Sequence, residues 1–180
     1  MNLKKIKILS VLGIFLLSFL SHFAYNLFPN IIFSFIFPVN ESIWEHMKIL
    51  FTSTLLYGII DYLLLKKYNI KYNNFNFQLY FTALIGIPIY LVIYLPLYNL
   101  LGESPLISIS LLLIVYIITQ IVSYNILKEK ELKLLNLITI PIILLSYLGF
   151  IYLTYNPPHT YIFYDITEDK YSINDYIKLE

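Results

Sequence analysis

The chain has 180 residues, of which 59% are hydrophobic and 13% are charged, and its formal net charge is +1. A soluble domain usually carries about 25% charged residues, so this composition excludes a water-exposed globule and indicates that lipid surrounds the protein. The small net charge gives no electrostatic support for a nucleic-acid partner, and the lack of cysteine excludes disulfides and cysteine-ligated metal sites.

Five windows are long and apolar enough to cross a bilayer, which takes about 20 mostly apolar residues. In chain order they cover about 6–28, 42–65, 77–100, 105–127 and 132–155. The first has a basic start, as signal peptides do, but its apolar run exceeds the usual ~7–15 residues and no Ala-x-Ala site follows, so we expect a retained span. The sequence therefore predicts an all-α polytopic membrane bundle over residues 1–158 and a short extracytoplasmic tail over 159–180.

An apolar run between the first two windows is too short to cross the membrane. It covers residues 31–37 and is bounded by Pro29 and Pro38. As a helix it would reach only about 10 Å at 1.5 Å per residue. We therefore expect a half-helix that is either re-entrant or interfacial.

Along the chain, inter-span segments that contain lysine alternate with segments that contain none. Lysines occur before the first window, in the 66–76 loop and in the 128–133 loop, whereas the loops around 29–41 and 102–105 have none. Cytoplasmic loops of membrane proteins carry an excess of Lys and Arg. We therefore expect a cytoplasmic N-terminus and an extracytoplasmic C-terminus. The richness in Ile, Asn, Tyr and Lys is typical of an AT-rich genome, so we expect a bacterial cell membrane.

The most polar block of the chain is PVNESIWEHMK at residues 38–48, where the second span begins. Ser42 and Glu45 fit the Ser-x-x-Glu capping box that starts many helices, and Asn40 is an equally good candidate for the N-cap. Capping does not explain Glu45, His46 and Lys48, which lie one to two turns into the span. Ionisable groups at that depth are costly unless paired or facing water, so they are functional candidates. Glu41 and Glu45 share a face, and Lys48 is close enough to neutralise one of them.

The three histidines of the chain all fall at the predicted extracytoplasmic ends of spans. Three imidazoles with nearby carboxylates are typical of a zinc site that keeps one open position for water. The predicted zinc ligands are His22, His46 and His159. The predicted general base is Glu45, and the predicted orienting residues are Ser42, Glu41 and Asp165.

Two classes of function remain open from these residues. One is a metal-dependent hydrolase acting on a lipid or envelope substrate. The other is a non-enzymatic transporter or membrane assembly protein, in which the polar block forms a structural network with Tyr, Ser and backbone partners. A polar path from Asp61 to Glu45 would favour transport, and a pocket closed on the cytoplasmic side would favour the enzyme. No HExxH, nucleophile elbow or P-loop decides between them.

The tail after residue 159 is amphiphilic, with aromatic and apolar residues at 161–164 ahead of an acidic run. This pattern predicts either a segment folded back over the mouth of the bundle or a short hairpin.

Together, the 38–48 block, the upstream His22-Phe23-Ala24-Tyr25, the sequence NPPH at 156–159 and FYD at 163–165 resemble a known family. This is a family of small bacterial multipass membrane proteins that is defined only as a domain of unknown function. The resemblance covers most of the chain and implies that the polar block is the family's signature. It implies no activity.

Overall fold

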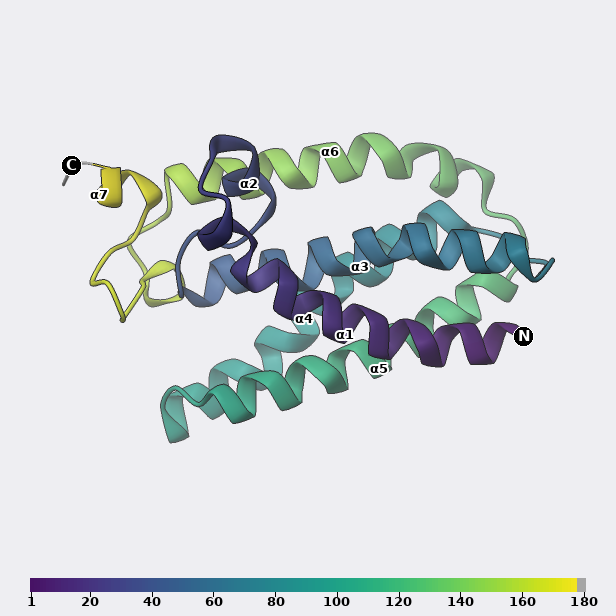
Figure 1. Cartoon of the computed structure of the whole chain (residues 1–180), viewed down its shortest axis with the longest axis horizontal. Helices are drawn as coiled ribbons and strands as arrows, with labels where there is room; N and C mark the ends of the chain where they lie inside the picture. The colour runs from purple at the N-terminus through teal and green to yellow at the C-terminus, as the bar shows by residue number, and fades with distance from the viewer. Residues whose placement is uncertain (178–180) are drawn as a thin grey trace.

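The computed structural model describes residues 1–177 and is built almost entirely of α-helices (Figure 1). The five long helices are α1 (Leu3–Leu27), α3 (Ile43–Lys67), α4 (Phe75–Leu101), α5 (Pro105–Lys128) and α6 (Lys133–Tyr155). Each is long and apolar enough to span a membrane. The prediction of an all-α, five-span bundle is therefore confirmed, and the protein is a multipass membrane protein.

Side-chain caps fix where several helices begin. Asn2 precedes α1 and its Oδ1 accepts from the Lys5 amide at 3.0 Å. Asn30 accepts from two amides at the start of the short helix α2 (Ile31–Ile36). Ser42 is the N-cap of α3, and its hydroxyl accepts from the Glu45 amide at 3.3 Å. These oxygens satisfy amides that have no partner within the helix, and the predicted cap at Ser42 is confirmed.

The antiparallel long helices give the bundle two chemically different ends (Figure 1). We call the end with the N-terminus and the α3–α4 and α5–α6 loops the lysine end. There Asn74 joins the two loops, because its Nδ2 donates to the carbonyls of Ile126 and Lys130 at 3.1 and 2.9 Å. We call the opposite end, where α1 ends and α3 begins, the histidine end.

Helix α3 lies at the centre of the bundle. We compared the share of buried residues over the most apolar 18 residues of each long helix. This share is 61% in α3 and at most 33% in the other four helices. Met47, Leu50 and Phe51 of α3 are almost fully buried in the core. The polar block at the start of α3 is therefore drawn into the interior.

The short helix α2 is held at the histidine end by Lys48. This lysine is fully buried, and its Nζ donates to the carbonyls of Ser34 at 2.9 Å and Phe37 at 3.4 Å. A cation at a helix C-terminus satisfies free carbonyls and favours the helix dipole. Residues 31–36 thus form the predicted half-helix, packed against α6.

The tail returns to the bundle. It contains a 3₁₀ turn η1 (Tyr161–Phe163), an antiparallel bridge between Asp165 and Lys170, and the short helix α7 (Ile173–Ile177). The ring of Phe163 lies against Trp44 of α3 with centroids 5.0 Å apart. Both alternatives for this segment are therefore present, since it folds back and also forms a minimal hairpin.

Candidate metal centre

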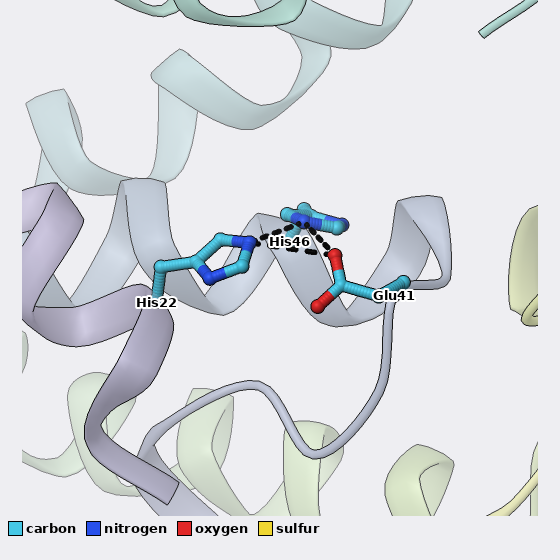
Figure 2. A group of neighbouring side chains, drawn as sticks. All are labelled: His22, Glu41 and His46. Carbon is cyan, nitrogen blue, oxygen red and sulfur yellow. Dashed lines mark hydrogen bonds and ion pairs between the residues drawn. The ribbon is translucent and has the colours of Figure 1, made fainter. Parts of the chain in front are cut away.

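Three side chains from two helices and one loop meet at the histidine end. Figure 2 shows His22 of α1, His46 in the first turn of α3, and Glu41 in the loop before α3. The two imidazole Nε2 atoms lie 3.2 Å apart. Oε2 of Glu41 lies 3.4 Å from Nε2 of His22 and 3.3 Å from Nε2 of His46. We call these three residues the triad.

The triad has the dimensions of one face of a zinc coordination tetrahedron. Donors bound to Zn²⁺ at 2.0–2.1 Å with tetrahedral angles lie about 3.3 Å from one another. The three edges of the triad are 3.2, 3.3 and 3.4 Å. A single ion can therefore contact all three atoms without moving the helices, and the fourth position is left for water or substrate.

A hydrogen bond at Nδ1 of His46 fixes the tautomer of the ring, so that the lone pair of Nε2 faces the triad. Nδ1 of His46 lies 2.9 Å from the carbonyl oxygen of Ser42. A carbonyl only accepts, so Nδ1 carries the proton and Nε2 of the neutral ring has a free lone pair. Neutral His46 and ionised Glu41 then present two acceptors 3.3 Å apart. A proton or a metal cation is needed between them.

Glu41 is held both through its carboxylate and through its backbone. Without a metal, hydrogen bonds from His22 and from the protonated ring of His46 hold the pKa of the Glu41 carboxyl well below the usual range, so the group is an anion. Its amide donates to Oδ2 of Asp165 at 3.1 Å, and Asn40 accepts from the next amide, that of Ser42, at 3.0 Å. The loop therefore presents a charged oxygen in a fixed place.

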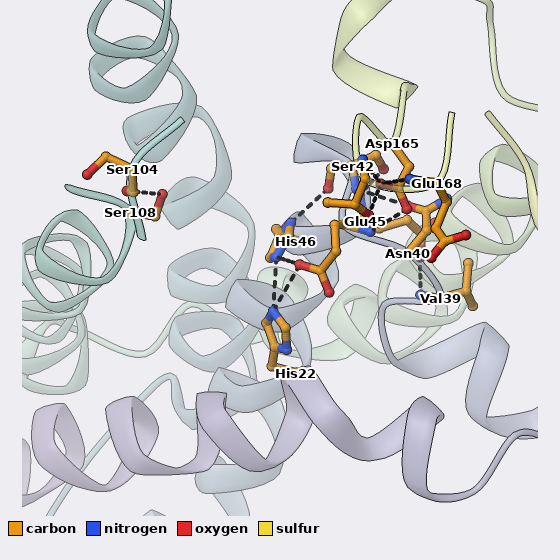
Figure 3. Close-up of polar contacts among 12 residues, drawn as sticks. His22, Val39, Asn40, Ser42, Glu45, His46, Ser104, Ser108, Asp165 and Glu168 are labelled. Atoms are coloured by element: carbon orange, nitrogen blue, oxygen red, sulfur yellow. Dashed lines mark hydrogen bonds and ion pairs between the residues drawn. The ribbon is translucent and has the colours of Figure 1, made fainter. Parts of the chain in front are cut away.

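Glu45, the predicted general base, lies in a different network from the triad (Figure 3). Its carboxylate is buried, forms an ion pair with Lys48 at 2.8 Å, and accepts from the Thr154 hydroxyl at 2.7 Å and the Val39 amide at 3.0 Å. These contacts join α3, α6 and the loop before α3. A catalytic role for Glu45 stays a prediction.

His159 and Asp165, both predicted for the site, have separate positions in the tail. The ring of His159 stacks on Tyr171, with centroids 4.5 Å apart and an interplanar angle of 14°. Among the described residues, the ligand atoms of His22, Glu41 and His46 all lie within 4.8 Å of one another, so Glu41 takes the place predicted for His159. Asp165 reaches the site through the Glu41 amide, as an orienting residue would. Ligation by His159 stays a prediction.

A cavity of about 290 Å³ adjoins the triad. It extends to α5, where Ser108 lies on its wall (Figure 3). Tyr90, Tyr94 and Tyr98 of α4 also line it, with successive ring centroids 5.1 and 5.7 Å apart. We did not predict these tyrosines, although their spacing of four residues places them on one face of a helix and was the signal available.

The cavity ends in the histidine half of the bundle. Along α1 and α3 of the described chain its lining reaches no deeper than Ser18 and Leu50. Below it, the hydroxyls of Ser18 and Tyr116 are 2.6 Å apart, and Tyr116 and Val115 are at most 1% exposed. Packed side chains therefore close the pocket toward the lysine end.

Comparison with known families assigns the chain to one of them. The model of a family of unknown function, DUF6512, matches residues 1–173, so the chain belongs to this family. No curated protein and no solved structure matches the chain. The match includes the triad, the cavity lining and most of the tail, in agreement with the resemblance to a multipass family without a known activity. Any function must therefore be argued from the site itself.

Proposed function

We propose that this member of the DUF6512 family is a metal-dependent membrane hydrolase in which His22, His46 and Glu41 hold a zinc ion or a similar divalent cation. The observation that carries the proposal is the triangle of three ligand atoms beside a cavity. Two histidines, one glutamate and one open position form a donor set of catalytic zinc sites. A cation between His46 Nε2 and the Glu41 carboxylate also removes the repulsion between these two acceptors, which lie 3.3 Å apart.

Such a site is suited to hydrolysis of an ester. A zinc ion held this way lowers the pKa of a water molecule to about 7 and polarises a carbonyl or phosphoryl oxygen. In the reaction the water oxygen bonds to the acyl carbon or phosphorus, the ester bond breaks, and a water proton passes to the leaving oxygen. Tyrosine hydroxyls of the cavity wall are the protein's candidates for donating hydrogen bonds to the developing oxyanion.

The proposed orientation places this chemistry outside the cytoplasm. Lysines gather at the end of the bundle opposite the triad, and the positive-inside rule assigns that end to the cytoplasm. The triad then faces the extracytoplasmic side of a bacterial membrane. A lipid or an envelope component is the substrate within reach.

The buried polar groups support an enzyme rather than a transporter. Asp61 of α3 is paired with Lys7 and accepts from Ser10 at 2.6 Å, and all three are at most 4% exposed. Among the described residues, the cavity beside the triad does not extend to this cluster. A pocket open at one end fits a reaction, whereas transport would also require a second conformation that opens the pocket toward the lysine end.

Metal content tests the proposal. We would measure transition metals by plasma mass spectrometry on protein purified in detergent without chelators. About one ion per chain is expected in the wild type. The substitutions His46→Ala and Glu41→Gln should remove most of it, and His159→Ala should retain it. Melting temperatures of each variant separate loss of metal from loss of fold.

Other results would change the assignment. A wild type without bound metal, or His46→Ala with undiminished metal, would contradict the site. Loss of metal in both His46→Ala and His159→Ala would restore the set of three histidines that the sequence predicts.

A further inference from the structure

We infer that the substrate is a lipid bearing an acyl chain, and that it reaches the triad sideways from the bilayer through an opening between α1 and α5. The inference rests on the proposed metal site and specifies its substrate class. It is carried by the divergence of the two helices, the residues at the edge of the cavity and the depth of the triad.

Helices α1 and α5 are joined near the lysine end and separate toward the histidine end (Figure 1). Lys7 of α1 donates to Gln120 of α5 at 3.3 Å, and the hydroxyls of Ser18 and Tyr116 are 2.6 Å apart. Beyond Ser18, residues of both helices line the cavity. The cavity therefore occupies the wedge where the helices diverge.

Three large apolar side chains of the spanning helices belong both to the cavity lining and to the outer surface. Phe19 and Phe23 of α1 are 38% and 53% exposed, and Ile109 of α5 is 39% exposed. Within apolar spanning helices, the outer surface faces hydrocarbon. We call these residues the rim. A side chain that lines a cavity and is also exposed marks its opening, so the rim marks an opening onto lipid.

Access from the aqueous side is narrowed by the tail. Tyr161, Tyr164, Ile166 and Thr167 line the same cavity from the segment that follows the last span. Asp165 in the middle of this segment is bound to the Glu41 amide at 3.1 Å. The tail therefore narrows the cavity at its polar end, where Tyr161 and Ile166 are still 52% and 56% exposed, and the apolar side of the opening lies between α1 and α5.

The depth of the triad matches the ester region of a lipid. With α1 centred on the bilayer, His22 lies seven residues beyond the central residue Phe15, or about 10 Å from the midplane. The hydrocarbon core extends about 15 Å from the midplane. The triad thus lies about 5 Å inside the hydrocarbon boundary, close to the ester bonds of membrane lipids. The deep end of the cavity, at Ser18, lies at the level of the acyl chains.

The polarity of the cavity lining falls from the histidine end of the bundle toward the deep end at Ser18. Glu41, Glu103 and Thr167 line the cavity near its polar end, and Met47, Leu50 and Leu112 line its deeper part. A pocket with a few polar groups at one end and apolar walls at the other fits an amphiphile. The acyl chain lies in the deep part and the ester bond lies at the triad.

Obstructing the rim tests this route. We would introduce Phe23→Trp and Ile109→Trp at the rim, and Leu20→Trp and Leu106→Trp as controls on the same two helices. The control residues are 68% and 77% exposed and do not line the cavity. Native mass spectrometry in detergent with added dioleoyl phosphatidylglycerol measures the lipid retained, and plasma mass spectrometry measures the metal in the same samples.

We expect the wild type and both controls to retain one lipid per chain. The rim variants should retain it about tenfold less, because an extra ring fills the space of several methylenes, with metal content unchanged. Equal lipid retention in all variants, equal loss in rim and control variants, or no lipid on the wild type would overturn the inference while the metal site stands. Absence of metal from the wild type would instead refute the proposed function.

Discussion

His46 donates its Nδ1 proton to the carbonyl oxygen of Ser42, one turn earlier in the chain, at 2.9 Å. The same Ser42 caps α3 through its hydroxyl. One residue thus fixes both the start of the helix and the tautomer of the imidazole. Metal-binding histidines commonly donate the other ring N–H to a carbonyl or carboxylate in this way.

Bound metal should be released by acid over the range in which imidazoles take up protons. A ligand imidazole must be neutral, and its ordinary pKa is about 6.5. The pKa of Glu41 is held well below its usual range by hydrogen bonds with the two imidazoles, so this carboxylate stays charged above that low value. We expect metal to leave as the solution is acidified, because protons compete with the cation for the ring nitrogens.

This release is measured as metal retained after equilibration at each pH. Glu41→Gln should lose the small amount of metal that it retains over a similar range, because the imidazoles still set the dependence. Metal retained unchanged to the low pH at which Glu41 itself titrates would contradict histidine ligation.

Asp165→Asn should weaken metal binding without unfolding the bundle. One oxygen of Asp165 accepts from the Glu41 amide, and the other accepts from the amides of Thr167 and Glu168. An asparagine retains only one accepting oxygen, so one of the two interactions is lost and the loop of Glu41 is less firmly held. We expect metal affinity to fall about tenfold, as for other residues that orient ligands.

Competition with a chromophoric chelator measures this affinity. Asp175→Asn is the control for the loss of one negative charge in the same tail, since Asp175 accepts from the amides of Tyr171 and Ser172 through a single oxygen. If both substitutions weaken metal binding equally, the effect belongs to the tail as a whole and positioning of Glu41 by Asp165 is refuted.

Lys48→Met should destabilise the protein strongly. The Lys48–Glu45 ion pair is at most 3% exposed, and removal of the cation leaves a buried carboxylate unpaired. Breaking a buried pair in this way costs about 3–5 kcal/mol. The double substitution Glu45→Gln with Lys48→Met should recover part of this loss, because no charge is then left uncompensated.

The free energy of unfolding in mixed micelles, titrated with a denaturing detergent, gives both values. Lys133→Met serves as the control, because its pair with Glu131 is long at 4.0 Å and exposed, and its loss should cost less than about 1 kcal/mol. Equal effects of Lys48→Met and Lys133→Met would show that the buried pair does not stabilise the fold.

The sequence by itself determined the spans, their order and the polar block at the start of α3. Hydropathy suffices because a membrane-spanning helix satisfies its own backbone hydrogen bonds and needs only a sufficient apolar length. The N-cap at Ser42 was predictable for the same local reason, since a cap depends on residues within one turn. The half-helix at 31–36 followed from the length of its apolar run and the prolines on either side.

Only the tertiary structure decided which polar groups meet. Topology predicts the depth of a residue in the membrane but leaves the rotation of each helix about its axis open. His22 and His46 face each other because of the way α1 packs on α3, and the third member of the triad is Glu41 because a short loop carries its carboxylate to them. His159 shares their end of the bundle, but its ring is stacked on Tyr171 of the tail. These choices depend on rotation and loop path, which packing fixes and local sequence does not.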